Sequence, residues 1–342
     1  MVEGKVISIS TIAYVLGMNG KKLHRWYQDI LSGFKEAKES EDIYKHDLKI
    51  MEEGVYKTVK VPILKPENMG NKLAIDEKTI DGVCYTILSN RESGKIITMA
   101  DTLKTQHLYT ILRNIPIAER LKVKSLSRDM APNYDWLGRQ AFLSAYHVID
   151  KFHVIKDAIV FLQAVRIRHR QELLTKKRLD KEQKIKDTSV IYSNGDSDLQ
   201  LIAKSNRLLF KMPSTWSEPQ KARAALLFKH YPEIHTAYKA VVELRQWYRP
   251  TKGKTSYKKT RLVKAKQLRE IITDFKSTGI SEIQNLANMI NNHFTPIISY
   301  FIANETNAKA EALNSQIQRF IMANYGLRNT DFFLFRLKGY FS

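Results

Sequence analysis

Cysteine is almost absent from this sequence, since the 342 residues contain only Cys84. A single cysteine excludes an intramolecular disulfide and any zinc finger built on cysteine ligands, and it fits a reducing compartment. Cys84 lies in an apolar, β-branched run, so we expect it to be buried in the core. The sequence also lacks an apolar run near the roughly 20 residues of a membrane-spanning helix. Residues 1–10 lack the pattern of a signal peptide, so none is expected.

Acidic residues are few relative to basic ones. The chain has 56 Lys and Arg against 35 Asp and Glu, a formal net charge of +21. A surplus of this size favours a polyanionic partner, and nucleic acid is the commonest one. A membrane surface is the alternative, but it would need an amphipathic apolar stripe beside the basic runs, and most apolar residues here fit a core.

Two short helices with a turn between them are predicted over residues 8–28. Apolar residues recur at helical spacing, the small Ala13 permits close helix contact, and Gly17 begins the turn. We expect Ile12, Val15 and Leu16 to share one apolar face. This spacing is typical of a helix-turn-helix, whose second helix would present its basic side chains to DNA. Those side chains are Lys21, Lys22, His24 and Arg25. The alternative is an ordinary helical hairpin with a basic surface.

A strand-rich block follows a charged segment, residues 46–70, that we expect to be a linker. The expected strands are residues 72–79, 83–90, 95–101, 123–129 and 146–150, and the expected helices are residues 102–114 and 134–144. The order β-β-β-α-β-α-β predicts an α/β fold with a ribonuclease-H-like mixed sheet, an assignment by analogy that needs support from a site. We therefore predict two domains in this part of the chain. Residues 1–45 would form the helix-turn-helix-like DNA-binding segment, and residues 71–150 would form the first part of a catalytic domain.

A long helical block is predicted over residues 151–295, starting with one helix that becomes strongly basic. Within it, residues 249–269 hold nine Lys or Arg and no acid. Like charges repel, so a phosphate backbone is a good reason to keep them together, although a solvated face or flexible loop is the alternative. The candidates for DNA contacts are Lys252, Lys254, Lys258, Lys259 and Arg261. The chain ends with residues 296–342, where 305–323 is expected to be a helix.

Three carboxylates are candidates for a shared site. Asp76 lies in the middle of an apolar strand, while the next residue, Glu77, points to the opposite face. Asp129 ends the fourth strand, and Glu311 lies between small alanines on the last expected helix. Taken singly, Asp76 could be a paired core acid, Asp129 could cap the turn before Pro132, and Glu311 could be a surface acid. Together they suit Mg²⁺, and two such ions about 3.5–4 Å apart promote phosphoryl transfer.

Four stretches of this sequence resemble one family. They are LAIDEKTIDGVCYTILSN, SLSRDMAPNY, VIDKFHVIKDAIVFLQAVR and TNAKAEALNSQIQRFIMANYGLRN, in the family's order, over about residues 70–340. The sequence resembles bacterial insertion-sequence transposases of the ISL-three group, which have a ribonuclease-H-like DDE domain. The resemblance implies that Asp76, Asp129 and Glu311 are the catalytic, metal-binding triad. It also implies that the helical block is an insertion between the fifth strand and the Glu311 helix.

Two features depart from the family's pattern. Longer members carry a cysteine-rich zinc-binding segment, where this chain has a short helix-turn-helix-like segment. The helix after the catalytic glutamate often carries lysines where this chain has glutamines, so Arg319 is the expected substitute, with Arg328 a further DNA contact. Asp150 and His153 belong to another motif of the resemblance; they could assist the site, or Asp150 could cap a helix.

The sequence thus predicts a DNA transposase that cuts and joins DNA at insertion-sequence ends with two Mg²⁺ ions, which Mn²⁺ could replace. We expect a homodimer or larger assembly on double-stranded DNA, in the cytoplasm of a bacterium and associated with its nucleoid. One alternative is a ribonuclease-H-like DNA nuclease that does not join strands. Another is a transposase-derived DNA-binding protein without catalysis.

Overall fold

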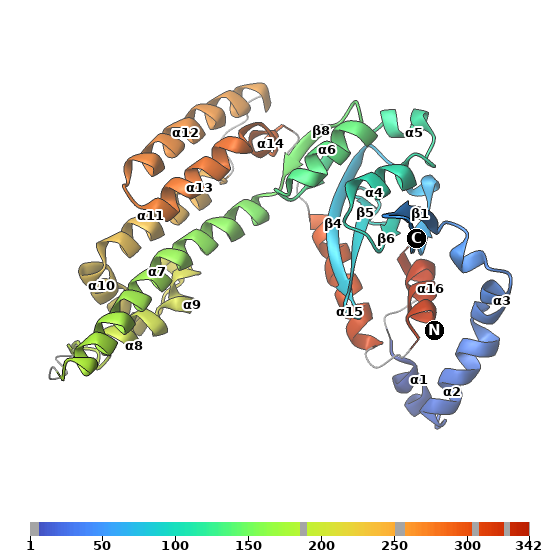
Figure 1. Cartoon of the computed structure of the whole chain (residues 1–342), viewed down its shortest axis with the longest axis horizontal. Helices are drawn as coiled ribbons and strands as arrows, with labels where there is room; N and C mark the ends of the chain where they lie inside the picture. The colour runs from blue at the N-terminus through green and yellow to red at the C-terminus, as the bar shows by residue number, and fades with distance from the viewer. Residues whose placement is uncertain (1–6, 185–189, 250–256, 303–307, 325–328, 342) are drawn as a thin grey trace. The chain divides into compact units, whose positions relative to one another are not determined.

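A computed structural model describes residues 7–184, 190–249, 257–302, 308–324 and 329–341. The chain forms two compact units (Figure 1). Met1–Val148 and Glu305–Ser342 make the first, which contains the sheet, and Ile149–Asn304 make the second, which is helical.

The first unit is built on a six-stranded sheet of order β3-β6-β5-β4-β7-β8. Its strands are β3 (Ile63–Leu64), β4 (Lys72–Ile80), β5 (Val83–Asn90), β6 (Ile96–Ala100), β7 (Ser125–Arg128) and β8 (Tyr146–Ile149). Strands β4, β5 and β6 are antiparallel neighbours, and β7 is parallel to β4. Three antiparallel strands extended by a parallel one confirm the predicted α/β, ribonuclease-H-like mixed sheet.

Each face of this sheet has its own apolar core. The helices of the first face are α4 (Thr105–Leu112), α5 (Ile117–Leu121) and α6 (Pro132–Ala141), and those of the second are α15 (Ala308–Ala323) and α16 (Thr330–Phe341). On the first face, Leu73, Ile75 and Leu126 pack with residues of α4 and α6. On the second face, Ile80 and Ile87 pack with α15 and α16. Alternation along each strand therefore sends successive side chains to different helices.

Several elements of the first unit differ from the expectations. Residues expected to be a linker form a two-stranded hairpin, β1 (Leu48–Glu52) and β2 (Val55–Val59), followed by β3 and a 3₁₀ turn (Pro66–Asn68). Helices α5 and α16 were also not predicted. The expectation that Cys84 is buried is wrong, because it is the second residue of β5, next to the Asp81–Gly82 turn, and is half-exposed there.

The N-terminal segment contains the two predicted helices, α1 (Ile9–Val15) and α2 (Gly20–Trp26). Asn19 caps α2 by accepting hydrogen bonds from the backbone of its first turn, and Gly17 takes a left-handed conformation in the turn. A π-helical turn (Tyr27–Leu31), α3 (Phe34–Glu39) and a 3₁₀ turn (Asp42–Tyr44) follow. One expectation is wrong: Val15 and Leu16 are 73% and 60% exposed, because α1 ends there and its buried face is formed by residues nearer its start.

The N-terminal segment packs against α16. Phe332 is fully buried and makes edge-on contacts with the rings of His24, Tyr27 and Phe34. His24, expected to face outward, is therefore turned partly into this core, and burial lowers its pKa. These contacts attach the segment to a C-terminal helix far away in sequence.

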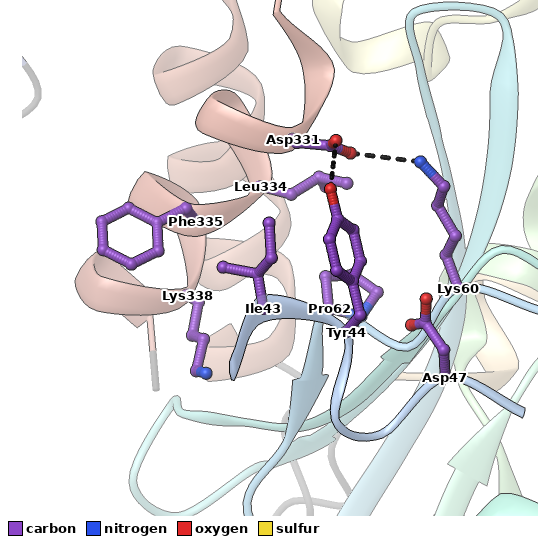
Figure 2. Close-up of a pocket in the computed structure, with 9 residues that line it drawn as sticks. All are labelled: Ile43, Tyr44, Asp47, Lys60, Pro62, Asp331, Leu334, Phe335 and Lys338. Atoms are coloured by element: carbon purple, nitrogen blue, oxygen red, sulfur yellow. Dashed lines mark hydrogen bonds and ion pairs between the residues drawn. The ribbon is translucent and has the colours of Figure 1, made fainter. Parts of the chain in front are cut away.

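A polar contact supplements this packing (Figure 2). Asp331 accepts hydrogen bonds from the Tyr44 hydroxyl at 2.9 Å and the Lys60 ammonium at 3.1 Å. Burial, with the Asp331 hydrogen bond, raises the pKa of Tyr44 to about 12. The neighbouring cavity has a volume of about 30 Å³. That is room for water but not for a substrate, so we interpret this contact as structural.

The described part of the second unit is mainly helical, with a bridge between Ile191 and Ser197 and a 3₁₀ turn (Pro213–Thr215) in its connections. Its helices are α7 (Lys151–Glu182), α8 (Asp198–Lys204), α9 (Asn206–Leu209), α10 (Glu218–His230), α11 (Pro232–Trp247), α12 (Tyr257–Ser277), α13 (Ser281–Asn292) and α14 (Phe294–Ser299). Within the described ranges, no helix combines the length and apolar character needed to cross a membrane.

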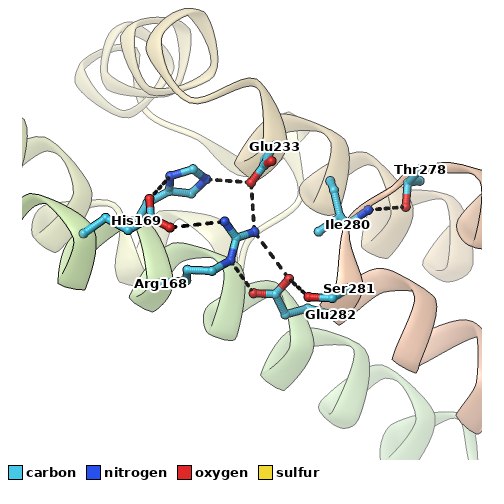
Figure 3. A network of polar contacts seen from close by, with 8 residues as sticks. Arg168, His169, Glu233, Thr278, Ile280, Ser281 and Glu282 are labelled. Atoms are coloured by element: carbon cyan, nitrogen blue, oxygen red, sulfur yellow. Dashed lines mark hydrogen bonds and ion pairs between the residues drawn. The ribbon is translucent and has the colours of Figure 1, made fainter.

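A charged network joins three helices of this unit (Figure 3). Arg168 on α7 pairs with Glu282 on α13 and Glu233 on α11, each at 2.8 Å, and His169 also contacts Glu233. The hydrogen bond from Arg168 lowers the pKa of Glu282 and that of Glu233. Part of the basic charge of α7 is thus used inside the unit.

Candidate active site

Asp76 lies within β4, and Asp129 directly follows the neighbouring strand β7. Strands β4 and β7 are parallel, with Lys72 opposite Ser125 and Ala74 opposite Ser127. This pairing ends two residues before Asp76 and Asp129. Neighbouring strands lie about 4.8 Å apart, so the two aspartates follow paired positions of adjacent strands.

Both aspartates belong to the sheet face that α15 and α16 cover. Asp76 alternates with Ile75, which packs against the helices of the other face, and it is opposite Ile87, which packs with α15. Glu77 points away from it, toward α6, as the sequence predicted. Arg128 also points toward α6, so alternation places the side chain of Asp129 on the face of Asp76.

The two carboxylates are half-exposed and make local hydrogen bonds. Asp76 Oδ1 accepts from the backbone N–H of Glu77 at 2.8 Å. Asp129 Oδ1 accepts from the N–H of Ala131 at 2.9 Å. The turn-capping interpretation of Asp129 is therefore observed, and it orients a carboxylate that solvent still reaches.

The third candidate, Glu311, lies in the first turn of α15. Leu313, Ile317 and Phe320 pack this helix on the sheet face that carries Asp76. The side chain of Glu311 lies outside the part of the structure that is described. The backbone thus brings the Glu311 helix to the same face as the two aspartates.

The donor set suits a hard cation. Carboxylate oxygens are what Mg²⁺ prefers, together with water and phosphate oxygens. Among the described side chains, no group of three His, Cys, Asp or Glu could hold a metal ion. Asp76 and Asp129 are two of the three expected ligand residues, and the side chain of the third, Glu311, is not among those described.

A buried arginine lies next to Asp129, and sequence reasoning missed it. The side chain of Arg128 is 1% exposed, and it donates to the Asp129 carbonyl at 2.9 Å and to Asp135 of α6 at 2.6 Å. Burial alone would raise the pKa of Asp135, but the Arg139 hydrogen bond and the Arg128 charge lower it to about 2. Burial and the charge of Arg128 lower the pKa of His147, which packs against the same group. The sequence alone did not distinguish Arg128 from the other basic residues.

Gly138 lets α6 approach this network closely. A Cβ at Gly138 would lie 2.8 Å from the ring of His147 and 2.8 Å from Leu126. We expect Gly138→Ala to lower the free energy of unfolding by about 1–3 kcal/mol, because Leu126 is buried and the His147 side chain, 8% exposed, is held by its polar contacts. Chemical denaturation measures this, with Gly339→Ala in α16 as the control.

The control removes a helical glycine where a new Cβ meets nothing within 4 Å. Gly339→Ala should stabilise by up to about 1 kcal/mol, the gain in helix propensity. Equal effects of the two substitutions would contradict the close approach at Gly138.

Asp150 and His153 belong to the helical unit. Asp150 caps α7, since its Oδ1 accepts from the N–H of Phe152 at 2.7 Å. It is 4% exposed. His153 lies in the first turn of α7 with its ring edge-on to Phe152. The helix-capping interpretation of Asp150 is therefore the one that the structure shows.

The expected DNA contacts are partly described. Lys21, Lys22 and Arg25 are exposed on α2, Lys259 and Arg261 on α12, and Arg319 on α15. Lys22 also lies over the Trp26 ring at 4.8 Å. Outside the described residues are Lys252, Lys254 and Arg328, and the side chain of Lys258.

Comparisons with known proteins identify the family. No curated protein matches the chain. Among solved structures, a Drosophila P element transposase strand transfer complex is similar over 79% of this chain and 76% of that chain, with 14% identity. Its TM-score of 0.31 is too low to carry an argument about this protein. The family model for transposases of the DDE, ISL-three group matches residues 73–337. That match covers most of the sequence, and the chain therefore belongs to the ISL-three family of DDE transposases.

Proposed function

We propose that this transposase cuts DNA at the ends of an insertion sequence and joins the freed ends to target DNA, using Asp76, Asp129 and Glu311. The observation that supports the proposal is the parallel pairing of β4 and β7, which ends two residues before Asp76 and Asp129, beside the sheet face on which α15 packs. Phosphoryl transfer depends mainly on positioning and charge neutralisation, and paired carboxylates on rigid strands suit both.

The three carboxylates would hold two Mg²⁺ ions, which Mn²⁺ could replace. When bound, such ions supply activation of the attacking oxygen and stabilisation of the leaving one. In cleavage, a water oxygen attacks the phosphorus at the element boundary and the 3′ oxygen leaves. In joining, that 3′-hydroxyl attacks a phosphodiester of the target and displaces its 3′ oxygen. The number of phosphodiester bonds is conserved in the second step, so it needs no external energy source.

We propose that successive segments of the chain have separate roles. The segment 1–45 would help to choose the DNA sequence, and 46–70, which form the β1–β2 hairpin and β3, would join it to the catalytic domain. Residues 71–150 and 296–342 would form the catalytic domain, and 151–295 would be an insertion domain. Lys259 and Arg261 on α12, with Lys252, Lys254 and Lys258 before them, would hold the DNA backbone. The net charge of +21 supports this, because each phosphate contact releases counterions.

Arg319 on the Glu311 helix, and Arg328 after it, would add phosphate contacts. The protein would work as a homodimer or larger assembly, because two transposon ends must be cut together. It would act in the bacterial cytoplasm, on nucleoid DNA.

The test is strand cleavage by the full chain on labelled DNA that carries the element's own ends, with Mg²⁺ or Mn²⁺. We expect a nick at the element boundary and, with target DNA added, a joined product. Cleavage without joining would indicate the nuclease instead. Specific binding without any cleavage would indicate a DNA-binding protein that has lost catalysis.

Neutralising two exposed cations of α2 should weaken binding to the element's ends. For Lys21→Gln/Arg25→Gln we expect the slope of log affinity against log salt to fall by about 1 for each phosphate contact removed. Fluorescence anisotropy at several salt concentrations measures the slope.

The control is Lys35→Gln/Lys45→Gln, which removes the same charge from lysines paired with Glu39 and Asp42. If both double variants change the slope equally, α2 contributes only general charge and does not contact the DNA ends.

A further inference from the structure

Helix α6 contacts a polar residue beside each candidate aspartate. The Tyr134 hydroxyl donates to Glu77 Oε1 at 2.7 Å, and Glu77 directly follows Asp76. The next residue of the helix, Asp135, accepts from Arg128 at 2.6 Å, and Arg128 directly precedes Asp129. Two consecutive residues of one helix are thus joined to the two strands that carry the carboxylates.

Both contacts are fixed by further partners. Tyr134 is 2% exposed, and its hydroxyl also lies 3.3 Å from the hydroxyl of Thr86 on β5. The Arg128 guanidinium has two further partners, the Asp129 carbonyl at 2.9 Å and His147 on β8 at 3.4 Å. Neither Tyr134 nor Arg128 can rotate away without breaking several bonds in a buried place.

These contacts lie on the face of the sheet opposite to that of the two aspartates. Successive side chains of a strand point to opposite faces, so a residue held on one face sets the backbone rotation that aims its neighbour on the other. Holding Glu77 therefore constrains the direction of Asp76, and holding Arg128 constrains that of Asp129. Because one helix does both, it also constrains the distance between the two strands at this point.

Metal binding is sensitive to such constraints. Mg²⁺ demands nearly ideal octahedral geometry with ligands about 2.0–2.1 Å away. Groups that orient metal ligands without touching the metal typically contribute about 10–100-fold to metal affinity. We propose that Tyr134 of α6, and Arg128, which Asp135 of α6 holds, are positioning residues that keep Asp76 and Asp129 at the spacing a divalent cation needs. This inference rests on the proposed function, since it presupposes that the aspartates bind metal.

The test is equilibrium binding of Mn²⁺ to the full chain without DNA, followed by electron paramagnetic resonance. We expect Tyr134→Phe and Arg128→Leu each to weaken Mn²⁺ binding by about 10–100-fold. Glu77→Leu should weaken it as much as Tyr134→Phe, and the double variant should be no worse than either. Glu77→Gln keeps an acceptor for the hydroxyl, so it should retain most of the affinity.

Two controls separate positioning from general stability. Tyr109→Phe removes a hydroxyl from α4, and Arg139→Ala removes the other, 68% exposed, arginine partner of Asp135. Both should bind Mn²⁺ like the wild type. All variants are compared under conditions in which circular dichroism shows that they are folded. A merely structural role would change the midpoint of unfolding and leave the Mn²⁺ affinity of the folded protein unaltered.

The outcomes distinguish this inference from the proposed function. If Asp76→Asn loses Mn²⁺ binding while folded Tyr134→Phe and Arg128→Leu bind as wild type does, the metal site stands and the positioning role is overturned. If Asp76→Asn binds Mn²⁺ as wild type does, the metal site is wrong, and the positioning role falls with it.

Discussion

Asp76→Asn and Asp129→Asn are each expected to lower the rate of strand cleavage by about a thousandfold or more. The substitution keeps the shape of the side chain and removes the charge that holds a cation. A catalytic metal contributes several kcal/mol of transition-state stabilisation. Each 1.36 kcal/mol is a factor of ten in rate, so a loss of about 4 kcal/mol gives the thousandfold effect.

The measurement is single-turnover cleavage of labelled transposon-end DNA, with binding followed separately by gel shift. Binding should be retained, because removing an acid from a basic protein does not weaken its attraction for phosphate. Glu119→Gln serves as the control, since Glu119 is a surface acid of α5 whose partner is Lys122. Cleavage by both aspartate variants at the wild-type rate would remove the basis of the proposed mechanism.

Glu311→Gln should have an effect of the same size. The structure supports this through the position of α15, and the resemblance to the family supports it through the residue itself. Glu305 is the next candidate for the third ligand, and like the side chain of Glu311 it lies outside the described residues. If Glu311→Gln cuts like the wild type and Glu305→Gln does not, the third ligand has been assigned to the wrong glutamate.

Phe332→Ala is expected to lower the free energy of unfolding of the first unit by about 3–5 kcal/mol, the usual range for removing a buried phenyl ring. Phe332 is 0% exposed, and three aromatic rings of the N-terminal segment surround it at 5.1–5.8 Å. The cavity would open between α16 and that segment.

The measurement combines urea denaturation with limited proteolysis before residue 45. Protease should cut the segment faster in the variant, because its apolar anchor is lost while the sheet keeps its own cores. Tyr14→Ala is the control, since Tyr14 is 87% exposed and its loss should change little. Unchanged proteolysis in Phe332→Ala would show that the polar contact of Tyr44 with Asp331 is enough to hold the segment.

Much of the sheet could be predicted from the sequence because each strand carries a local signal. The runs around Ile75 and Ile87 are β-branched, and turns containing glycine separate them. The hairpin β1–β2 was missed because its strands are short and rich in charge. Only Leu48 and Ile50 of β1 pack against the core, while Met51 and Tyr56 are exposed. Such a pattern resembles that of a charged linker.

Helix α16 was missed for the opposite reason. Phe332, Phe333, Leu334 and Leu337 lie almost all around it, so it has no polar stripe of helical period. The structure explains this, because one side of α16 packs on the sheet and another holds the N-terminal segment. Arg336 lies between them, near the rings of Tyr27 and Phe320.

The candidate site was accessible to sequence reasoning only in part. Asp76 stood out as an acid within an apolar strand. The expected strand order then predicted that Asp129 lies near Asp76. Glu311 could not be chosen from spacing alone, because many acids lie on helices. The role of Arg128 depends on burial by α6 and β8, which no local pattern shows.

Helix α16 packs against the N-terminal segment and against one face of the sheet. This has a consequence for the synthesis of the chain. Ribosomes deliver the chain from its N-terminus at about 5–20 residues per second. The N-terminal segment and one face of the sheet must then wait for residues 330–341, which emerge long after them. A chain that stops before residue 308 lacks both these anchors and Glu311. Such a fragment therefore has neither the packing that holds its N-terminal segment nor the third candidate ligand.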